Sequence, residues 1–353
     1  MGTCRRESGD GVVAVGKLKT ASEADSVTSA AQTTIPKIGR SRISVAISLL
    51  MLAVAAFALY FLLRDVDVHK VVAALRAQSV QKIAIAGAFV VAGYVTLTFY
   101  DVFALRTIGH GRVPYPVAAL ASFTSSTIGH SLGAAVLTGG LVRLRIYSAW
   151  GLTAIDIAKI AVITGMTFWL GNAFLLGGAI VYAPEAASAV DQLPSWINRT
   201  IGLAGLLALA CYLLWLAPRQ RAIGRSSWRL VLPGLRATLL QIGIGVADLS
   251  LVALAMYTLL PATPAVAFDT VLVVFLTSSF LGTVSHAPGG LGIIEATMLF
   301  GLRQFQKEEL LAALLTFRVL YFVLPLLVAA LSLWLRELQV LARGESAAQD
   351  PST

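Results

Sequence analysis

The residues best suited to chemistry lie in a short polar stretch within an otherwise apolar part of the chain. His286 and Glu295 flank the sequence Pro288-Gly289-Gly290. A carboxylate and an imidazole beside such a turn could line a polar vestibule and meet a cationic headgroup or a proton. Glu295 could instead cap a half-helix or form a structural ion pair with Arg318 or Arg145. We interpret Pro288, Gly289 and Gly290 as the turn itself, because glycine tolerates backbone conformations in which a Cβ would clash.

Two arginines follow a second glycine pair in the first half of the chain. Arg143 and Arg145 come shortly after Gly139 and Gly140, which we interpret as another structural turn. A guanidinium suits bidentate contact with a phosphate, and a phospholipid headgroup supplies one. The alternative for both arginines is the positive charge that ordinarily marks the cytoplasmic end of a membrane helix.

Two further ionisable residues fall inside apolar runs. Asp248 lies in the middle of one run, and Arg318 lies a third of the way into another. Such groups are costly in a bilayer and usually face a cavity or a partner. A structural ion pair between Asp248 and Arg318 is the alternative, and Asp101, near the end of a run, is expected at the interface. The candidate substrate-binding residues are Arg143, Arg145, Asp248, His286, Glu295 and Arg318.

One motif matches a catalytic pattern in its sequence but lacks the structural context that the pattern requires. Gly129-His130-Ser131-Leu132-Gly133 fits the nucleophile elbow of hydrolases, but that elbow needs a strand before the serine and a helix after it. The surroundings here are those of a membrane helix, in which two glycines four residues apart also form a packing motif. We predict no catalytic residue, no metal site and no cofactor.

The composition indicates that membrane helices position all of these residues. The chain has 353 residues, of which 57% are hydrophobic and 13% are charged, and its mean hydropathy is +0.81. Soluble domains carry about 25% charged residues, so we predict an all-α polytopic membrane protein. The net charge of +9 fits cytoplasmic loops rich in Lys and Arg, and we expect no nucleic acid as a partner.

Six apolar runs are long enough to cross a bilayer as helices. They are Ile43–Leu63, Ile83–Ala104, Ile160–Tyr182, Ile201–Ala217, Ala237–Leu260 and Leu310–Leu335. Two glycine-broken segments, about 114–142 and 266–301, lie between them, and each could form two half-helices or two short spans. We expect a disordered basic cytoplasmic tail over 1–42, a transmembrane domain over 43–340 and a short cytoplasmic tail over 341–353.

The two broken segments are similar in sequence. Thr124-Ser125-Ser126 corresponds to Thr277-Ser278-Ser279, and the two glycine pairs follow in the same order. Because two helices precede each segment and one follows it, the first segment enters the membrane from the cytoplasm and the second from outside. We therefore predict two inverted-topology repeats, about 43–182 and 197–335, a plan that many secondary transporters share.

Charges in the loops orient the chain with both termini in the cytoplasm. Residues 218–236 hold five arginines and no acid, whereas residues 183–198 hold two acids and no basic residue. The more basic side is the cytoplasmic one. One loop fits poorly, because residues 64–82, predicted outside, carry four basic residues against two acidic ones. We expect an amphipathic helix at the interface there.

Two motifs resemble those of one known family. They read Ser285-His286-Ala287-Pro288-Gly289-Gly290-Leu291-Gly292-Ile293-Ile294-Glu295 and, less specifically, Gly139-Gly140-Leu141-Val142-Arg143. The family is the lysylphosphatidylglycerol synthase transmembrane region, which also occurs in small standalone inner-membrane proteins, and the resemblance covers roughly residues 43–340. In the bifunctional members of this family, a soluble C-terminal domain makes an aminoacylated phosphatidylglycerol. The resemblance implies that the transmembrane region flips this lipid. This chain ends about 18 residues after its last span, so lipid handling is carried over and aminoacyl transfer is not.

The expected function is that of a flippase-like phospholipid transporter in a bacterial inner membrane. The resemblance implies aminoacylated phosphatidylglycerol as a substrate. The alternatives are a membrane-embedded enzyme and an accessory partner in lipid or polyprenyl-linked glycan metabolism. Polar residues lie in both predicted repeats, which favours a transport pathway over one catalytic face. A membrane phospholipid is the expected partner, and the sequence leaves open a separate lipid-synthesising enzyme and a homo-oligomer.

Overall fold

Helices make up nearly all of the described structure. The computed structural model describes residues 68–335 apart from 133–134, 219–220 and 225–229. The helices are α3 (Val68–Ala77), α4 (Val80–Thr107), α5 (Tyr115–Leu132), α6 (Ala135–Tyr147), η1 (Ser148–Trp150), α7 (Ala154–Tyr182), α8 (Pro184–Asp191), α9 (Ser195–Leu216), α10 (Leu235–Leu259), α11 (Phe268–Val284), η2 (Pro288–Gly290), α12 (Ile293–Gly301), α13 (Lys307–Arg318) and η3 (Val319–Val323). A two-stranded ribbon, β1 (Ala222–Ile223) and β2 (Leu230–Val231), joins α9 to α10. The predicted all-α polytopic fold class is confirmed.

Five helices in the described part of the chain are long and apolar enough to cross a membrane. They are α4, α7, α9, α10 and the continuous helix Lys307–Leu335, which includes α13 and η3, and each overlaps one predicted span. Val91, Leu207 and Leu214 have exposed fractions of 64%, 64% and 72%, as expected for faces that meet hydrocarbon rather than water. The predicted span Ile43–Leu63 and the predicted tails lie outside the described residues.

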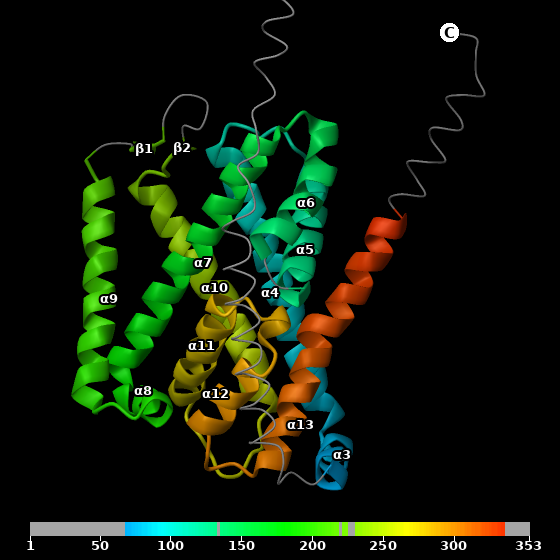
Figure 1. Cartoon of the computed structure of the whole chain (residues 1–353), viewed down its shortest axis with the longest axis vertical. Helices are drawn as coiled ribbons and strands as arrows, with labels where there is room; N and C mark the ends of the chain where they lie inside the picture. The colour runs from blue at the N-terminus through cyan, green and yellow to red at the C-terminus, as the bar shows by residue number, and fades with distance from the viewer. Residues whose placement is uncertain (1–67, 133–134, 219–220, 225–229, 336–353) are drawn as a thin grey trace, which may run out of the picture. The chain divides into compact units, whose positions relative to one another are not determined.

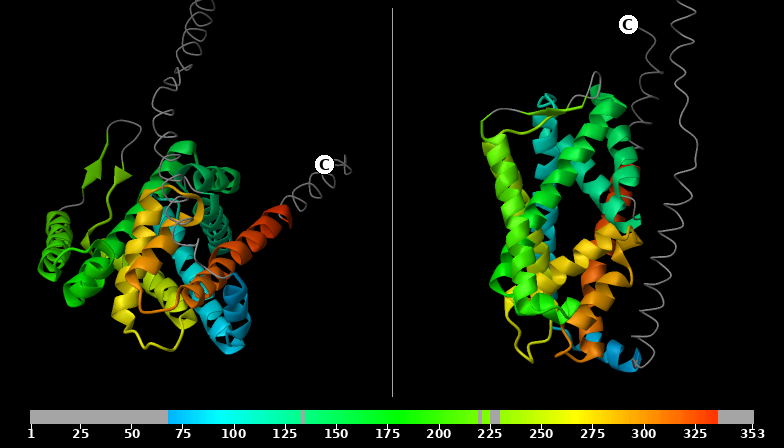
Figure 2. Two further views of the ribbon diagram at one scale, coloured as in Figure 1. Left: turned by 60° about the horizontal axis from the view of Figure 1, so that its bottom comes forward. Right: turned by 60° about the vertical axis from the view of Figure 1, so that its left-hand side comes forward.

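The two glycine-broken segments form two helical hairpins that start at opposite ends of this helical unit. In Figure 1, α5 and α6 lie in the upper part, and α11 and α12 lie in the lower part; the right-hand view of Figure 2 shows the same arrangement. α5 packs on α6 and α4, whereas α11 packs on α12 and α10. The hairpins meet, because α5 contacts η2. This is the order of elements that an inverted repeat requires, while the repeat itself and its orientation in a membrane stay predictions.

The returning helix of each hairpin is too short to cross a bilayer. α6 has 13 residues and α12 has 9, against about 20 for a hydrocarbon core of about 30 Å. The outgoing helices α5 and α11 have 18 and 17 residues, so each hairpin combines a longer outgoing arm with a shorter returning one. Irregular backbone at membrane depth must be buried in protein or line a polar cavity, and Gly289 and Gly290 of η2 are buried.

The first hairpin turns at a different place from the predicted one. Gly139 and Gly140 lie inside α6, whereas α5 ends at Leu132 and α6 begins at Ala135. Gly139 serves close packing, because a Cβ there would lie 2.9 Å from the carbonyl oxygen of Ser125 on α5. The predicted turn at Gly139 and Gly140 is therefore wrong, since both a turn and a close approach of two helices favour glycine.

Buried side chains hold the hairpins against the long helices. α4 and α10 pack along each other, and Ala253 and Met256 of α10 are fully buried in the main core. Gln241 of α10 donates to the carbonyl oxygen of Ile163 at 3.0 Å and to Oγ1 of Thr167 at 2.8 Å, both on α7. These contacts give both hairpins a fixed support. At the periphery, α3 supplies a helix within residues 64–82, where one was expected.

Candidate functional site

The second hairpin turns sharply at η2, with left-handed backbone at a residue that is not glycine. The φ angle is +54° at His286, +57° at Gly289 and +60° at Gly290. Positive φ is uncommon outside glycine, and such strained residues cluster at functional sites. The predicted turn at Pro288–Gly290 is present, and His286 is exposed beside it.

Glu295 lies in the first turn of α12 and makes two interactions. Its Oε2 accepts a hydrogen bond from the backbone N–H of Gly292 at 2.8 Å, a favourable position for a carboxylate at a helix N-terminus. Its Oε1 accepts from Nε of Arg318. Both structural alternatives foreseen for Glu295, the cap and the pair with Arg318, are thus present, and its partner is not Arg145.

Arg318 joins α13 to this turn. Its Nη1 donates to the carbonyl oxygen of Gly289 at 3.1 Å, and its guanidinium carbon lies 5.6 Å from the ring centroid of Phe322. Its Nη2 is buried and has no hydrogen-bond partner among the residues that the structure describes. A buried charged donor without an acceptor is costly, so Arg318 keeps an unused donor beside the turn. We call Arg318, Glu295 and η2 the turn site.

A π-helical turn follows Arg318 directly. The turn η3 spans Val319–Val323, and single π turns inside α-helices occur frequently at functional sites. Its Tyr321 carbonyl oxygen accepts a hydrogen bond from the hydroxyl of Tyr94 on α4 at 2.9 Å. The irregular turn is therefore anchored to the scaffold, and it fixes how the last span passes the turn site.

Arg143 forms a separate, buried cluster in the first hairpin. Its Nε and Nη2 donate to Oδ2 and Oδ1 of Asp101 at 3.0 and 2.8 Å. The hydroxyl of Tyr147 also donates to Oδ2 of Asp101 at 2.8 Å. Asp101 is 0% exposed and Arg143 is 7% exposed. Asp101 was expected at the membrane interface, and the structure adds that it is buried and neutralises an arginine of α6.

Asp248 is paired with a residue outside the turn site. Asp248 accepts a hydrogen bond from the Tyr100 hydroxyl at 3.0 Å through Oδ2, while its buried Oδ1 has no partner within the described ranges. The Asp248–Arg318 ion pair that the sequence left open is not formed, since the carboxylate that pairs with Arg318 is Glu295. Arg145 is exposed in the last turn of α6.

The turn site is therefore a small set of interacting groups rather than the whole predicted set. The structure brings together Glu295, Arg318 and Gly289, with His286 at the exposed edge. Sequence reasoning missed Asp101 and its hydroxyl partner Tyr147. The available signal was a carboxylate near the end of one helix and an arginine near the glycines of a later one. The arrangement offers an unused cationic donor next to a carboxylate, which suits a ligand with an anionic and a cationic group.

Comparison with known proteins gives two relatives that cover most of the chain. The "Uncharacterized protein slr0712" of Synechocystis sp. is 31% identical over 264 residues, which are 74% of this chain and 82% of that protein. The "Inner membrane protein YbhN" of Escherichia coli is 31% identical over 256 residues, which are 71% of this chain and 78% of that protein.

A third similarity is shorter. The "Phosphatidylglycerol lysyltransferase" of Staphylococcus haemolyticus is 36% identical over 66 residues, which are 18% of this chain and 8% of that protein. No protein-family model matches the sequence. The helices long enough to span a membrane agree with the name of the E. coli relative. The two extensive similarities show that this chain belongs to the membrane-protein family of slr0712 and YbhN.

Proposed function

We propose that this protein moves a phospholipid between the leaflets of a bacterial inner membrane, and that the turn site binds the headgroup. The observation that carries the proposal is the incompletely satisfied Arg318–Glu295 pair at a glycine turn, where two hairpins from opposite ends meet. Both chain termini are placed in the cytoplasm in this proposal. The long helices around the hairpins then form the wall that separates the headgroup from hydrocarbon.

The chemistry of the turn site suits a phospholipid headgroup. A phosphate oxygen would accept a hydrogen bond from Nη2 of Arg318, and charge-assisted hydrogen bonds of this kind are the stronger ones. A headgroup amine would be attracted to the carboxylate of Glu295, whose side chain is 10% exposed. An aminoacylated phosphatidylglycerol carries both groups and would engage both members of the pair.

The opposed hairpins give this site a route to either side. A polar site near the middle of a bilayer can serve transport if it opens to one side at a time, and opposed broken helices are a known way to build such a site. The partial similarity to a phosphatidylglycerol lysyltransferase supports a lipid over a water-soluble substrate. The inner-membrane name of the E. coli relative supports the proposed location.

Leaflet exchange in reconstituted vesicles tests the proposal. Purified protein is inserted into liposomes that contain fluorescent phosphatidylglycerol, with or without an aminoacyl group, and the fraction of label reached by an impermeant quencher is followed over time. We expect exchange by the natural sequence and a loss of at least about tenfold in Glu295→Gln, since one charge-assisted hydrogen bond contributes about 1.5–3 kcal/mol.

A matched variant controls for the loss of a carboxylate. Glu185 is exposed in α8, so Glu185→Gln should exchange lipid at the rate of the natural sequence. The proposal fails if the natural sequence exchanges none of these lipids. The assignment of the site fails if Glu295→Gln, inserted to the same level, exchanges lipid at the full rate.

A further inference from the structure

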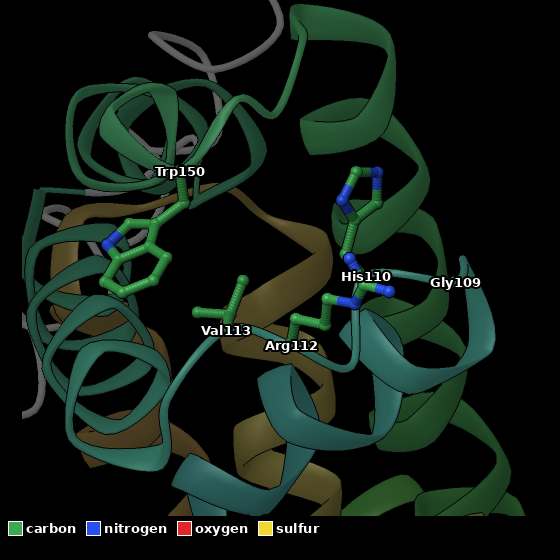
Figure 3. Close-up of a pocket in the computed structure, with 5 residues that line it drawn as sticks. All are labelled: Gly109, His110, Arg112, Val113 and Trp150. Carbon is green, nitrogen blue, oxygen red and sulfur yellow. The ribbon is translucent and has the colours of Figure 1, made fainter.

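A hollow lies away from the turn site, at the end of the helical unit formed by loops 108–114 and 148–153. Its volume is about 560 Å³, and it is lined by Gly109, His110, Arg112, Val113 and Trp150. Figure 3 shows Trp150 on one side and His110 and Arg112 on the other, with Val113 between them. Ligand sites commonly measure about 300–1,000 Å³, so the hollow is large enough for a headgroup.

The charges around this hollow favour an anion. Arg112 is exposed and makes no hydrogen bond or ion pair within the part of the chain that the structure describes. Nε2 of His110 lies 3.8 Å from Oδ2 of Asp156, and Nζ of Lys159 lies 3.9 Å from Oδ1 of the same carboxylate. One carboxylate thus faces Lys159 and His110, while Arg112 has no countercharge among the described residues. Those residues leave the rim positive even when the imidazole is neutral.

An apolar hollow adjoins the charged one. Its volume is about 440 Å³, and its lining residues are Pro116, Val117, Leu120, Ile146, Trp150, Ser332 and Leu335. Trp150 lines both hollows, so a positive pocket passes into an apolar groove across one indole ring. Tryptophan is enriched at the level of lipid headgroups in membrane proteins, which is where a charged pocket and an apolar groove should meet.

We propose that the two hollows form one docking site for an anionic phospholipid, with the phosphate at Arg112 and part of an acyl chain along Val117 and Leu120. A free phosphate would need only the charged hollow, so the adjoining apolar groove favours a lipid. The inference rests on the proposed transport and adds the place where lipid is loaded.

The docking site and the turn site share one helix. Ser332 and Leu335 form a wall of the groove on the helix that also carries Arg318. Ser332 lies 14 residues beyond Arg318 in the chain, which corresponds to about 21 Å at 1.5 Å per residue. A loaded lipid therefore lies on the same helix as the turn site, roughly two-thirds of a bilayer core away.

Photocrosslinking of the full-length protein in vesicles tests the docking site. Val113 is replaced by benzoylphenylalanine, and adducts are identified by mass spectrometry in phosphatidylcholine vesicles with and without phosphatidylglycerol. We expect phosphatidylglycerol adducts that fall about fivefold in Arg112→Gln, since one basic residue near a membrane contributes about 1 kcal/mol toward an anionic lipid. Arg106→Gln is the matched control, because Arg106 is exposed in the last turn of α4 and lines neither hollow; its adducts should be unchanged.

Several results would overturn the docking site. The proposal fails if phosphatidylcholine and phosphatidylglycerol form adducts equally, or if Arg112→Gln and Arg106→Gln lose adducts equally. It also fails if the probe forms adducts only with protein, or if inorganic phosphate displaces the lipid. The readout is separate from transport. Adducts that persist in a protein without leaflet exchange would support the docking site and refute the proposed function. Exchange without adducts would support the proposed function and refute the docking site.

Discussion

The two hairpins each hold an arginine paired with a carboxylate. The two pairs differ in their exposure to solvent and in how many of their polar atoms have hydrogen-bond partners. In the first hairpin the side chains of Arg143 and Asp101 are 8% and 0% exposed, and Tyr147 completes the cluster. In the second, the side chains of Arg318 and Glu295 are 15% and 10% exposed. One nitrogen of Arg318 bonds to the backbone of the turn and another has no partner among the described residues. The first pair is therefore a structural clamp, whereas the second retains a hydrogen-bond donor that can bind a ligand.

Breaking the clamp should have the largest effect on stability. Asp101→Asn leaves Arg143 buried without a countercharge, which we expect to lower the free energy of unfolding by about 3–5 kcal/mol. Thermal unfolding of the purified protein in detergent measures it. Tyr147→Phe removes only one hydrogen bond and should cost about 1 kcal/mol. An Asp101→Asn protein as stable as the natural one would show that the buried pair is not a clamp.

Separating the helices of the first hairpin should have the next largest effect. Gly139→Ala places a methyl group 2.9 Å from the Ser125 carbonyl oxygen, and overpacking of this kind costs about 1–3 kcal/mol. The same thermal measurement applies. Because the first hairpin has a structural role, the surviving folded fraction should exchange lipid normally. A selective loss of exchange would give both hairpins a role in binding.

Changing the turn of the second hairpin should affect transport more than stability. Gly289 has a φ of +57°, and an added Cβ would lie 3.4 Å from Nη1 of Arg318. Left-handed backbone costs about 1–2 kcal/mol in a residue with a side chain. Gly289→Ala should therefore lower stability by about that amount and displace Arg318, so that leaflet exchange falls severalfold per folded molecule. Undiminished exchange would separate the turn from the binding chemistry.

The smallest expected effect is a gain. Gly140 lies inside α6, and a Cβ there meets no atom within 4 Å. Replacing glycine by alanine in a helix interior is favourable by about 0.5–1 kcal/mol, so Gly140→Ala should raise the unfolding temperature slightly and leave exchange unchanged. A destabilised Gly140→Ala would restore the idea that this glycine is needed for a turn.

The long helices could be predicted from the sequence because burial in hydrocarbon demands length and apolarity, which composition reports directly. The predicted Ile160–Tyr182 lies within α7, and Ala237–Leu260 matches α10 to within two residues at either end. The hairpins were also predictable, since glycine, proline and charge together cannot face lipid. The position of the first turn was not, because Gly139 marks a helix contact rather than a bend.

The pairing of charged residues could be predicted only in part. Glu295 was expected to pair with Arg318 or Arg145, and Arg318 with Asp248 or Glu295, since all are costly to leave alone in a bilayer. Which groups meet depends on the rotation of each helix. The π turn at η3, immediately after Arg318, alters the rotation of that helix without an evident signal in its apolar sequence. The partner of Asp101 could not be predicted for a related reason, because nearness to a helix end does not reveal burial beneath another helix.

The most direct test of the difference between the two pairs replaces each arginine by lysine, which keeps the charge and removes the planar fork. Leaflet exchange per folded molecule and the unfolding temperature are measured together for Arg318→Lys and Arg143→Lys. Loss of one or two charge-assisted hydrogen bonds predicts that Arg318→Lys exchanges lipid at least about tenfold more slowly per folded molecule. Because Arg318 also bonds to Glu295 and to the Gly289 carbonyl, its unfolding temperature should fall as well. Arg143→Lys should unfold at a lower temperature while its folded molecules exchange lipid normally. Full exchange by Arg318→Lys, or a selective loss of exchange in Arg143→Lys, would contradict the assignment of the second pair as the binding site.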